Sequence, residues 1–352
     1  ALHEPNQLGD KMISVRWVGG KSGIEEDLLA REQVDFMTIP AAGIHGVGLR
    51  RLPGNLITLW KGFLAARKII RDYQPDAMFF TGGYLAVPIA LAGFSIPSLL
   101  FVPDIKPGLA LSVIARFTNS IAVVVEEARS YFSTRKDVRV SGYPVRRDLL
   151  KWERKGSFEA MELEPDQETL LVFGGSKGAR SINYALLKVL PDLLRKVQVI
   201  HISGKLDYED ILQQTDQMGE ELKNRYRLFP YLHEEMGAAL CCADLVVSRA
   251  GASILGEYPR FAVPAIVVPY PHAWDYQLRN ARYLEKLGAA EILLDQDLDQ
   301  ELQQTVEKLL EDPAKLSQMS EAMCTASKPE AASYLASWLK LLGGNKPEVR
   351  SV

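Results

Sequence analysis

The chain has 352 residues, of which 47% are hydrophobic and 24% charged, a composition typical of a globular protein with two domains. It carries 41 Lys and Arg against 44 Asp and Glu, and the formal net charge of -3 excludes the global basic field that attracts nucleic acid. Three cysteines, Cys241, Cys242 and Cys324, lack metal-ligand spacing, which favours free thiols in a reducing, cytosolic compartment.

Short apolar runs alternate with longer helical patterns along the chain. Apolar residues at helical spacing predict helices over 55–71, 183–194 and 276–287. The alternation predicts an α/β fold of parallel sheets covered by helices. The predicted strands are 13–18, 77–80, 98–102, 121–125, 170–173, 197–202, 244–248 and 265–268.

The stretch 77–103 contains no charged residue and is long enough to span a bilayer. Gly82, Gly83, Pro88 and Pro97 divide it into two apolar runs and a short helix at 87–92. These short runs favour buried parallel strands, with a membrane-spanning helix as the alternative.

The charged stretch 148–167 interrupts this rhythm in the middle of the chain. We therefore expect an N-terminal domain over 1–145 and a C-terminal domain over 146–325. For the remaining helix and tail, 326–352, we expect packing against the N-terminal domain.

A glycine turn at 174–179 joins a predicted strand to a predicted helix. Its glycines let backbone N–H groups approach an anion, Ser176 adds a hydroxyl, and the helix N-terminus favours a phosphate. The spacing matches neither a dinucleotide fingerprint nor a Walker A motif, so a tight turn without a ligand is the alternative. A second turn at 249–254 would open at the same sheet edge, and the pair favours phosphate binding.

Further polar residues surround these turns. Glu257 lies about one helical turn beyond the second turn, where a carboxylate can accept both hydroxyls of a ribose; a helix-dipole partner is the alternative. Gln277 and Asn280 could bind sugar hydroxyls or belong to a surface helix. Arg146 could reach a pyrophosphate or form a structural salt bridge. The turn 81–84 is a candidate anion site in the first half.

The histidines show no metal pair: His201 lies in a predicted strand as a core residue, and His45, His233 and His272 lie outside the predicted strands. The helix at 55–70 carries a broad apolar arc with basic residues beside it. This arc favours core packing, with contact to a membrane surface as the alternative. It comprises Leu56, Ile57, Leu59, Trp60, Phe63 and Leu64, beside Lys61, Arg67 and Lys68.

The motifs 81–84, 142–146, 174–180, 201–205, 231–236, 248–257 and 269–280 together resemble the MurG family, the UDP-N-acetylglucosamine transferases that complete lipid II. The resemblance spans nearly the whole chain. It implies a GT-B fold, in which two Rossmann-like domains with parallel sheets face a central cleft. It also implies inverting transfer, without metal or cofactor, from UDP-N-acetylglucosamine to a polyprenyl-pyrophosphate-linked muramoyl peptide, by a peripheral protein at the cytoplasmic face of the cell membrane.

The same resemblance implies roles for individual residues. Ser176 and Arg146 would hold the donor phosphates, and Leu232 would bind the uracil through its backbone. Glu257 would bind the ribose and Gln277 the N-acetylglucosamine hydroxyls. The phosphate and sugar would be lined by Ala252, Ser253, Ile254, Leu255 and Gly256, and the acceptor side by Gly82, Gly83 and Tyr84.

Two departures from the family pattern stand out. The family's Gly-Gly-Thr-Gly-Gly-His turn has no counterpart, so we expect its histidine and a central strand upstream of Ala1, leave the catalytic residue unassigned, and expect the chain as it stands to be inactive. The family's His-Glu-Gln-Asn run corresponds to 101–104, which places Asp104 at the donor sugar as a discriminator or a base. The alternatives are another UDP-sugar or lipid acceptor, and a non-catalytic nucleotide-sugar-binding protein.

Overall fold

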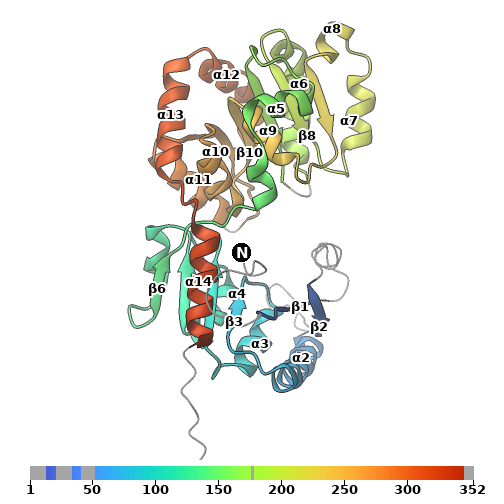
Figure 1. The fold of residues 1–352 in the computed structure, drawn as a ribbon. Helices are drawn as coiled ribbons and strands as arrows, with labels where there is room; N and C mark the ends of the chain where they lie inside the picture. The colour runs from blue at the N-terminus through green and yellow to red at the C-terminus, as the bar shows by residue number, and fades with distance from the viewer. Residues whose placement is uncertain (1–12, 21–33, 41–51, 176–177, 274, 345–352) are drawn as a thin grey trace, which may run out of the picture. The chain divides into compact units, whose positions relative to one another are not determined.

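The computed structural model describes residues 13–20, 34–40, 52–175, 178–273 and 275–344. The chain divides into two compact units. Unit 1 comprises Ala1–Ser141 and Ala332–Val352, and unit 2 comprises Gly142–Ala331. Both units are α/β with parallel sheets, which confirms the predicted fold class (Figure 1).

Unit 1 contains two parallel sheets. β1 (Arg16–Gly19) pairs with β2 (Asp35–Thr38). The second sheet has the order β3-β4-β5-β6 and is formed by β3 (Met78–Phe80), β4 (Ser98–Val102), β5 (Ser120–Val123) and β6 (Asp137–Val140). Every residue of β4 and β5 is buried, which explains why these central strands are apolar runs.

The uncharged stretch 77–103 is divided as its glycines and prolines predict. It forms β3, α3 (Ala86–Ala92) and β4, so the membrane-spanning alternative is wrong for this stretch. Across the ranges that the structure describes, none of the helices combines the length and apolarity that crossing a bilayer requires.

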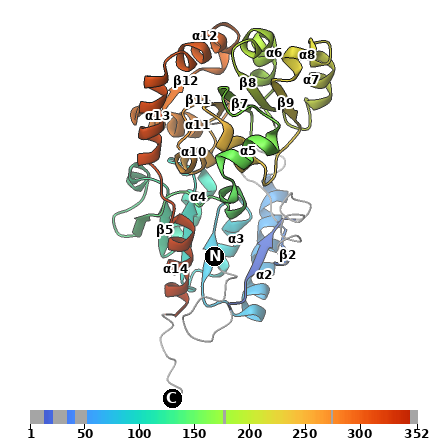
Figure 2. The ribbon, with the colours of Figure 1, turned by 45° about the horizontal axis from the view of Figure 1, so that its top comes forward.

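The helices of unit 1 cover its sheets (Figure 2). α14 (Ala331–Gly344) is tied to β6, because the Arg139 guanidinium lies over the ring of the buried Trp338, 4.6 Å from its centroid. The other helical elements of this unit are α2 (Leu52–Tyr73), α4 (Leu109–Phe117) and the 3-10 helix η1 (Glu126–Tyr131).

Unit 2 is built on one parallel sheet with the order β12-β11-β10-β7-β8-β9. Its strands are β7 (Thr169–Phe173), β8 (Gln198–Ile202), β9 (Tyr226–Phe229), β10 (Leu245–Arg249), β11 (Ala265–Val268) and β12 (Ala290–Ile292). Apolar side chains of α6 (Arg180–Leu194) and α12 (Leu298–Leu310) pack with those of β7, β8, β10 and β11 in one buried core. This arrangement is the doubly wound architecture in which ligands bind at the carboxyl ends of the strands.

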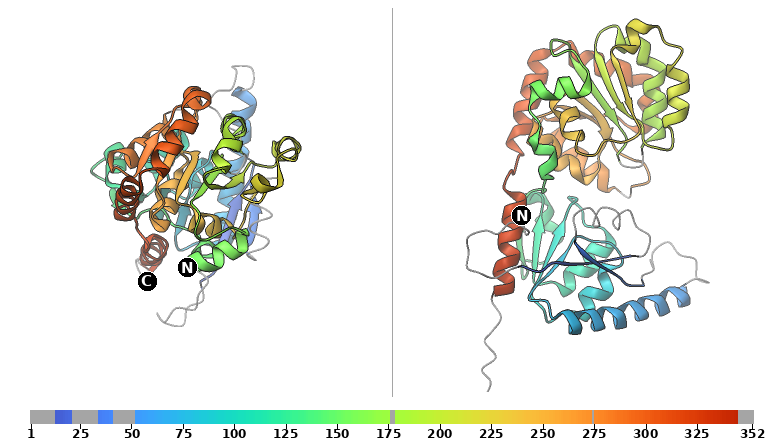
Figure 3. Two further views of the ribbon diagram at one scale, coloured as in Figure 1. Left: turned by 90° about the horizontal axis from the view of Figure 1, so that it is seen from above. Right: turned by 45° about the vertical axis from the view of Figure 1, so that its right-hand side comes forward.

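The remaining helical elements of unit 2 pack around this sheet (Figure 3). They are α5 (Arg154–Met161), α7 (Tyr208–Thr215), α8 (Glu220–Lys223), α9 (Met236–Cys242), α10 (Glu257–Phe261), α11 (Tyr276–Lys286), α13 (Pro313–Thr325), and the 3-10 helices η2 (Arg147–Lys151), η3 (Ala252–Leu255) and η4 (Asp295–Asp297).

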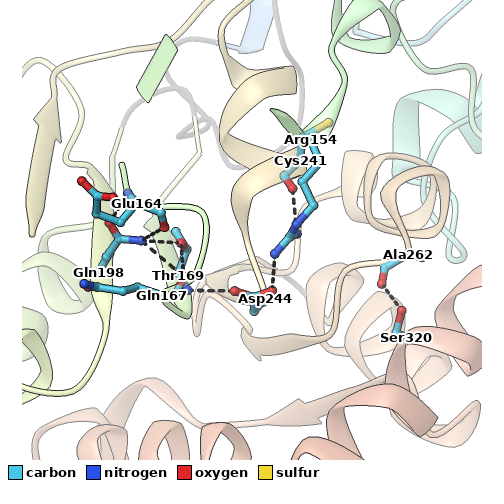
Figure 4. A network of polar contacts seen from close by, with 9 residues as sticks. All are labelled: Arg154, Glu164, Gln167, Thr169, Gln198, Cys241, Asp244, Ala262 and Ser320. Atoms are coloured by element: carbon cyan, nitrogen blue, oxygen red, sulfur yellow. Dashed lines mark hydrogen bonds and ion pairs between the residues drawn. The ribbon is translucent and has the colours of Figure 1, made fainter. Parts of the chain in front are cut away.

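Polar groups at the amino edge of this sheet hold one another (Figure 4). Asp244 accepts hydrogen bonds from the Thr169 N–H and from Arg154, both at 2.9 Å. The buried Gln198 amide donates to the Glu164 carbonyl at 2.8 Å and accepts from the Glu164 N–H at 2.7 Å. These side chains fix α5 and its connection to β7, so this edge serves the stability of the fold.

Candidate functional site

The first glycine turn joins β7 to α6 at the carboxyl edge of the unit 2 sheet. Gly175 and Gly178 have φ values of 90° and 77°, the left-handed region that favours glycine. A Cβ on Gly178 would lie 2.4 Å from the Ser203 carbonyl oxygen, so the turn is pressed against the end of β8. Ser176 lies outside the described residues, and its phosphate-binding role stays a prediction.

The second glycine turn joins β10 to η3. β10 pairs in parallel with β7, which confirms that both turns open at the same sheet edge. Glu257 begins the separate helix α10, because Gly256 ends η3 with a φ of -128°. The short η3 turn lies between the glycine and Glu257, which confirms that this carboxylate is about one helical turn beyond the second glycine turn.

Glu257 lies beside the second turn and is close enough to Arg146 to feel its charge. Burial raises the pKa of its carboxyl, while a hydrogen bond from Ser253 and the charge of Arg146 act in the opposite direction. Gly256 adjoins it, and a Cβ there would lie 2.7 Å from the Cβ of Tyr143. A poorly solvated carboxylate at this position is suited to accept hydrogen bonds from the hydroxyls of a ligand.

Arg146 fixes the loop that follows β9. Its guanidinium donates to the His233 carbonyl at 3.0 Å and lies 3.4 Å from the Asp148 carboxylate. Arg146 therefore does form a structural salt bridge, as one of the two interpretations expected. Half of its side chain remains exposed, so it stays accessible to a ligand. Leu232, in the same loop, is only 8% exposed, so its side chain belongs to the core.

The same loop is held a second time by the end of η2 and the residue after it. Lys151 forms an ion pair with Glu234, which lowers the pKa of that carboxyl. The Trp152 indole N–H donates to the Glu234 carbonyl at 2.8 Å. The 146–152 segment thus brings Arg146 and the loop together beside the second turn.

Two amide side chains of α11 have different surroundings. Gln277 accepts a hydrogen bond from the Tyr270 N–H at 2.9 Å. Asn280 is fully buried and donates to the Ala250 carbonyl at 3.2 Å. Asn280 therefore holds the backbone of the second turn. Because its side chain is buried, it neither contacts a sugar nor lies on an exposed helix face, so both interpretations of this residue were wrong.

A buried hydrogen-bonded chain supports the first turn. The Asn183 amide donates to the Ser203 carbonyl at 2.8 Å and to the Asp207 carboxylate at 2.9 Å. The Asn183 oxygen lies 3.0 Å from His201 Nε2, and His201 Nδ1 lies 2.7 Å from the Tyr226 hydroxyl. Both Asn183 N–H groups donate to Ser203 and Asp207, so only its oxygen, an acceptor, faces His201. His201 Nε2 must therefore carry the proton, and the Tyr226 hydroxyl must donate to Nδ1.

His201 is therefore a neutral core residue, as the sequence predicts. It is fully buried, and burial lowers its pKa from the usual 6.5 to about 3. Burial also raises the pKa of Tyr226, so the hydroxyl keeps its proton.

In unit 1, two predicted segments share one sheet edge. β3 and β4 pair in parallel, and the segment of Gly82 and Gly83 follows β3 while Asp104 follows β4. The two glycines have φ values of 119° and 83°, and Tyr84 is 44% exposed. Asp104 is partly buried. The acceptor-side and donor-sugar roles of these residues stay predictions.

The groups at the carboxyl edge of the unit 2 sheet are suited to bind a phosphate and neighbouring hydroxyl groups. This edge combines two glycine turns, the N-terminus of a long helix, an arginine and a partly buried carboxylate. Helix N-termini and an arginine suit a phosphate, and the carboxylate suits hydroxyl groups attached to it.

Comparison with known proteins agrees with this arrangement. The glycosyltransferase family 28 N-terminal domain matches residues 5–123, and the glycosyltransferase family 28 C-terminal domain matches residues 169–335. The chain is similar to the UDP-N-acetylglucosamine--N-acetylmuramyl-(pentapeptide) pyrophosphoryl-undecaprenol N-acetylglucosamine transferase of Roseiflexus sp. (strain RS-1), with 36% identity over 94% of this chain and 84% of that protein. The protein of that name from Desulfitobacterium hafniense (strain Y51) is 36% identical over 91% of this chain and 89% of its own length.

Solved structures share the fold. Acinetobacter baumannii MurG superposes with a TM-score of 0.71 at 23% identity, covering 93% of this chain and 91% of that one. A UDP-GlcNAc 2-epimerase from Neisseria meningitidis, bound to UDP-GlcNAc, gives a TM-score of 0.66 at 11% identity with the same two coverages. These likenesses establish the GT-B fold.

Proposed function

Because the chain belongs to glycosyltransferase family 28, we propose that it transfers N-acetylglucosamine from UDP-N-acetylglucosamine to a polyprenyl-pyrophosphate-linked muramoyl peptide, forming lipid II for peptidoglycan. The observation that carries the proposal is the shared sheet edge of the two glycine turns, with Glu257 and Arg146 beside the second. Such an edge suits a sugar linked to a nucleoside diphosphate.

In this proposal each group at the edge has one task. The turns, the α6 N-terminus, Ser176 and Arg146 bind the diphosphate, and Glu257 accepts the ribose hydroxyls. The backbone of Leu232 binds the uracil, which is consistent with its buried side chain. Gln277 uses its oxygen for the Tyr270 N–H, so its amide N–H groups are left to donate to the sugar. Negative charge on the departing UDP is stabilised by the same donors.

We expect Glu257→Gln to weaken UDP binding by about 1–3 kcal/mol, because a ribose hydroxyl loses its charged acceptor inside a partly buried site. Calorimetric titration of UDP measures the change. The matched control is Glu159→Gln, an exposed carboxylate of α5. Equal affinities for wild type and Glu257→Gln would remove the ribose role.

The transfer reaction itself decides between the enzyme and a binding protein. Labelled UDP-N-acetylglucosamine is incubated with a lipid-pyrophosphate-linked muramoyl peptide, and the labelled lipid is quantified. We expect label in the lipid, and not the inactivity expected from the missing glycine turn, because the family 28 N-terminal domain matches residues 5–123. UDP binding without any transfer would favour the non-catalytic alternative.

A second candidate function is transfer of another UDP-sugar, and Asp104 favours it. An ionised carboxylate accepts from sugar hydroxyls and cannot donate to an acyl oxygen. We expect Asp104→Asn to shift the ratio of kcat/KM from UDP-glucose toward UDP-N-acetylglucosamine by roughly tenfold, the scale of one charged hydrogen bond. Unchanged preference and turnover would mean that Asp104 is neither discriminator nor base.

We also propose that one face of α2 lies on the inner surface of the cytoplasmic membrane. Ile57, Trp60 and Leu64 are 58%, 61% and 50% exposed at helical spacing, so the core-packing interpretation is wrong for these three. The neighbouring Lys61 and Lys68 are exposed as well. An apolar helix face beside basic residues binds anionic lipid surfaces.

Trp60→Ala should weaken binding to vesicles containing anionic phospholipid by roughly tenfold or more, since one large apolar side chain is no longer buried in the interface. Co-sedimentation with vesicles measures it. Leu212→Ala is the control, because Leu212 is 42% exposed on α7 of unit 2. Equal losses in both variants would contradict a specific α2 face.

A further inference from the structure

Three side chains form a closed hydrogen-bonded triangle at the carboxyl edge of unit 2. Arg249 forms an ion pair with Asp295 and donates to the Ser181 hydroxyl oxygen at 2.7 Å. The Ser181 hydroxyl donates to the Asp295 carboxylate, also at 2.7 Å. We name these three residues the Arg249 clamp.

The Arg249 clamp reaches four neighbouring strands. Arg249 is the last residue of β10, and Ser181 is the second residue of α6, directly after the first glycine turn that follows β7. Asp295 follows β12, and Arg249 also donates to the Val268 carbonyl at the end of β11, at 3.4 Å. Since the sheet order is β12-β11-β10-β7, the clamp ties four consecutive strand ends together.

The burial of the clamp favours a geometric role. The Arg249 and Asp295 side chains are only 10% and 22% exposed, so desolvation offsets much of their attraction. The planar guanidinium fork, by contrast, fixes the direction of each hydrogen bond. The Arg249 guanidinium also lies 5.2 Å from the Tyr270 ring centroid, which restricts its movement further.

A second ion pair of α6 provides a contrast. Lys188 and Asp299 lie 2.5 Å apart, and each side chain is 58% exposed. This pair also joins α6 to the region after η4, but it lies farther along the helix from the glycine turn. An ion pair whose only task is to anchor α6 can be exposed and distant from the glycine turn, as this pair is, whereas the Arg249 clamp is mostly buried and adjoins the turn.

We propose that the Arg249 clamp positions the two glycine turns relative to each other, so that both reach the diphosphate of the donor. The inference rests on the proposed function, because it takes this edge as the donor site. In this role the clamp residues act through the turns and need no contact with the donor.

The test compares Ser181→Ala, Asp295→Asn and their double variant with the control Asp299→Asn. We expect each clamp variant to raise the KM for UDP-N-acetylglucosamine roughly tenfold, about one charged hydrogen bond, with kcat within roughly twofold. The double variant should be no worse than the worse single one, because both substitutions open the same triangle. Arg249→Lys should behave like them, since lysine keeps the charge and loses the fork.

Hydrogen–deuterium exchange of the free proteins supplies a readout without donor. Peptides covering 170–182 and 248–257 should exchange faster in the clamp variants and at the wild-type rate in Asp299→Asn. If the wild type binds no UDP but this exchange pattern appears, the donor proposal fails and the positioning role stands. Wild-type KM and exchange in the clamp variants, or faster exchange throughout unit 2, would overturn the inference.

Discussion

Replacing Gly178 by alanine should destabilise unit 2 by about 3 kcal/mol or more and abolish UDP binding. Gly178 has a φ of 77°, where an L-residue costs about 1–2 kcal/mol. Its new Cβ would in addition lie 2.4 Å from the Ser203 carbonyl oxygen, a backbone atom that no side-chain rotation can move away. The turn must therefore separate from the end of β8, which removes the backbone surface on which a diphosphate would rest.

Gly175→Ala is the matched control for this contact. Gly175 has a φ of 90° in the same turn, but a Cβ there would meet no atom within 4 Å. It should lose only the conformational cost of about 1–2 kcal/mol. Urea denaturation and UDP titration of both variants measure the difference. Equal destabilisation of the two variants would mean that the backbone near Ser203 moves away from the new Cβ at no cost in stability.

The sequence predicts all the central strands of the two larger sheets, and also β1 and β3, which lie at sheet edges. β4 and β10 are buried over almost their whole length and form continuous apolar runs. The strands β2, β6, β9 and β12 were not predicted, and each lies at the edge of its sheet. Edge strands are covered less completely, and β2 alternates exposed with partly buried residues over only four positions. Local pattern is weakest there because little of the strand is buried.

In the candidate site, features formed by neighbouring residues were predictable from the sequence, and contacts between residues far apart in the sequence were not. The two glycine turns were predictable because a strand, glycines and a helix start follow one another in the sequence. The Arg249 clamp was not, because Ser181 and Asp295 are 114 residues apart and meet only through the order of the strands. Asn280 was misjudged for a related reason, since helical spacing does not reveal which face meets the Ala250 carbonyl.

The second large effect is a loss of stability on acidification that depends on His201. The folded chain holds this histidine neutral, with a pKa of about 3 against the usual 6.5. Below pH 6.5 this histidine is therefore protonated in the unfolded state, whereas in the folded state it stays neutral until about pH 3. The contribution is complete above pH 6.5 and is lost as the pH falls toward 3. Between these values the free energy of unfolding should fall by about 1.4 kcal/mol per pH unit from this residue alone.

Urea denaturation at pH 7, 6 and 5 should show this slope in the wild type and a shallower one in His201→Gln. Glutamine offers an acceptor for the Tyr226 hydroxyl and a donor for the Asn183 oxygen, but it does not titrate in this range. Carboxylates contribute the same acid dependence to both proteins, so the difference in slope belongs to His201. A His201→Gln slope as steep as the wild type would mean that the buried chain accommodates a charged imidazole, contrary to the donor directions that Asn183 and Tyr226 impose.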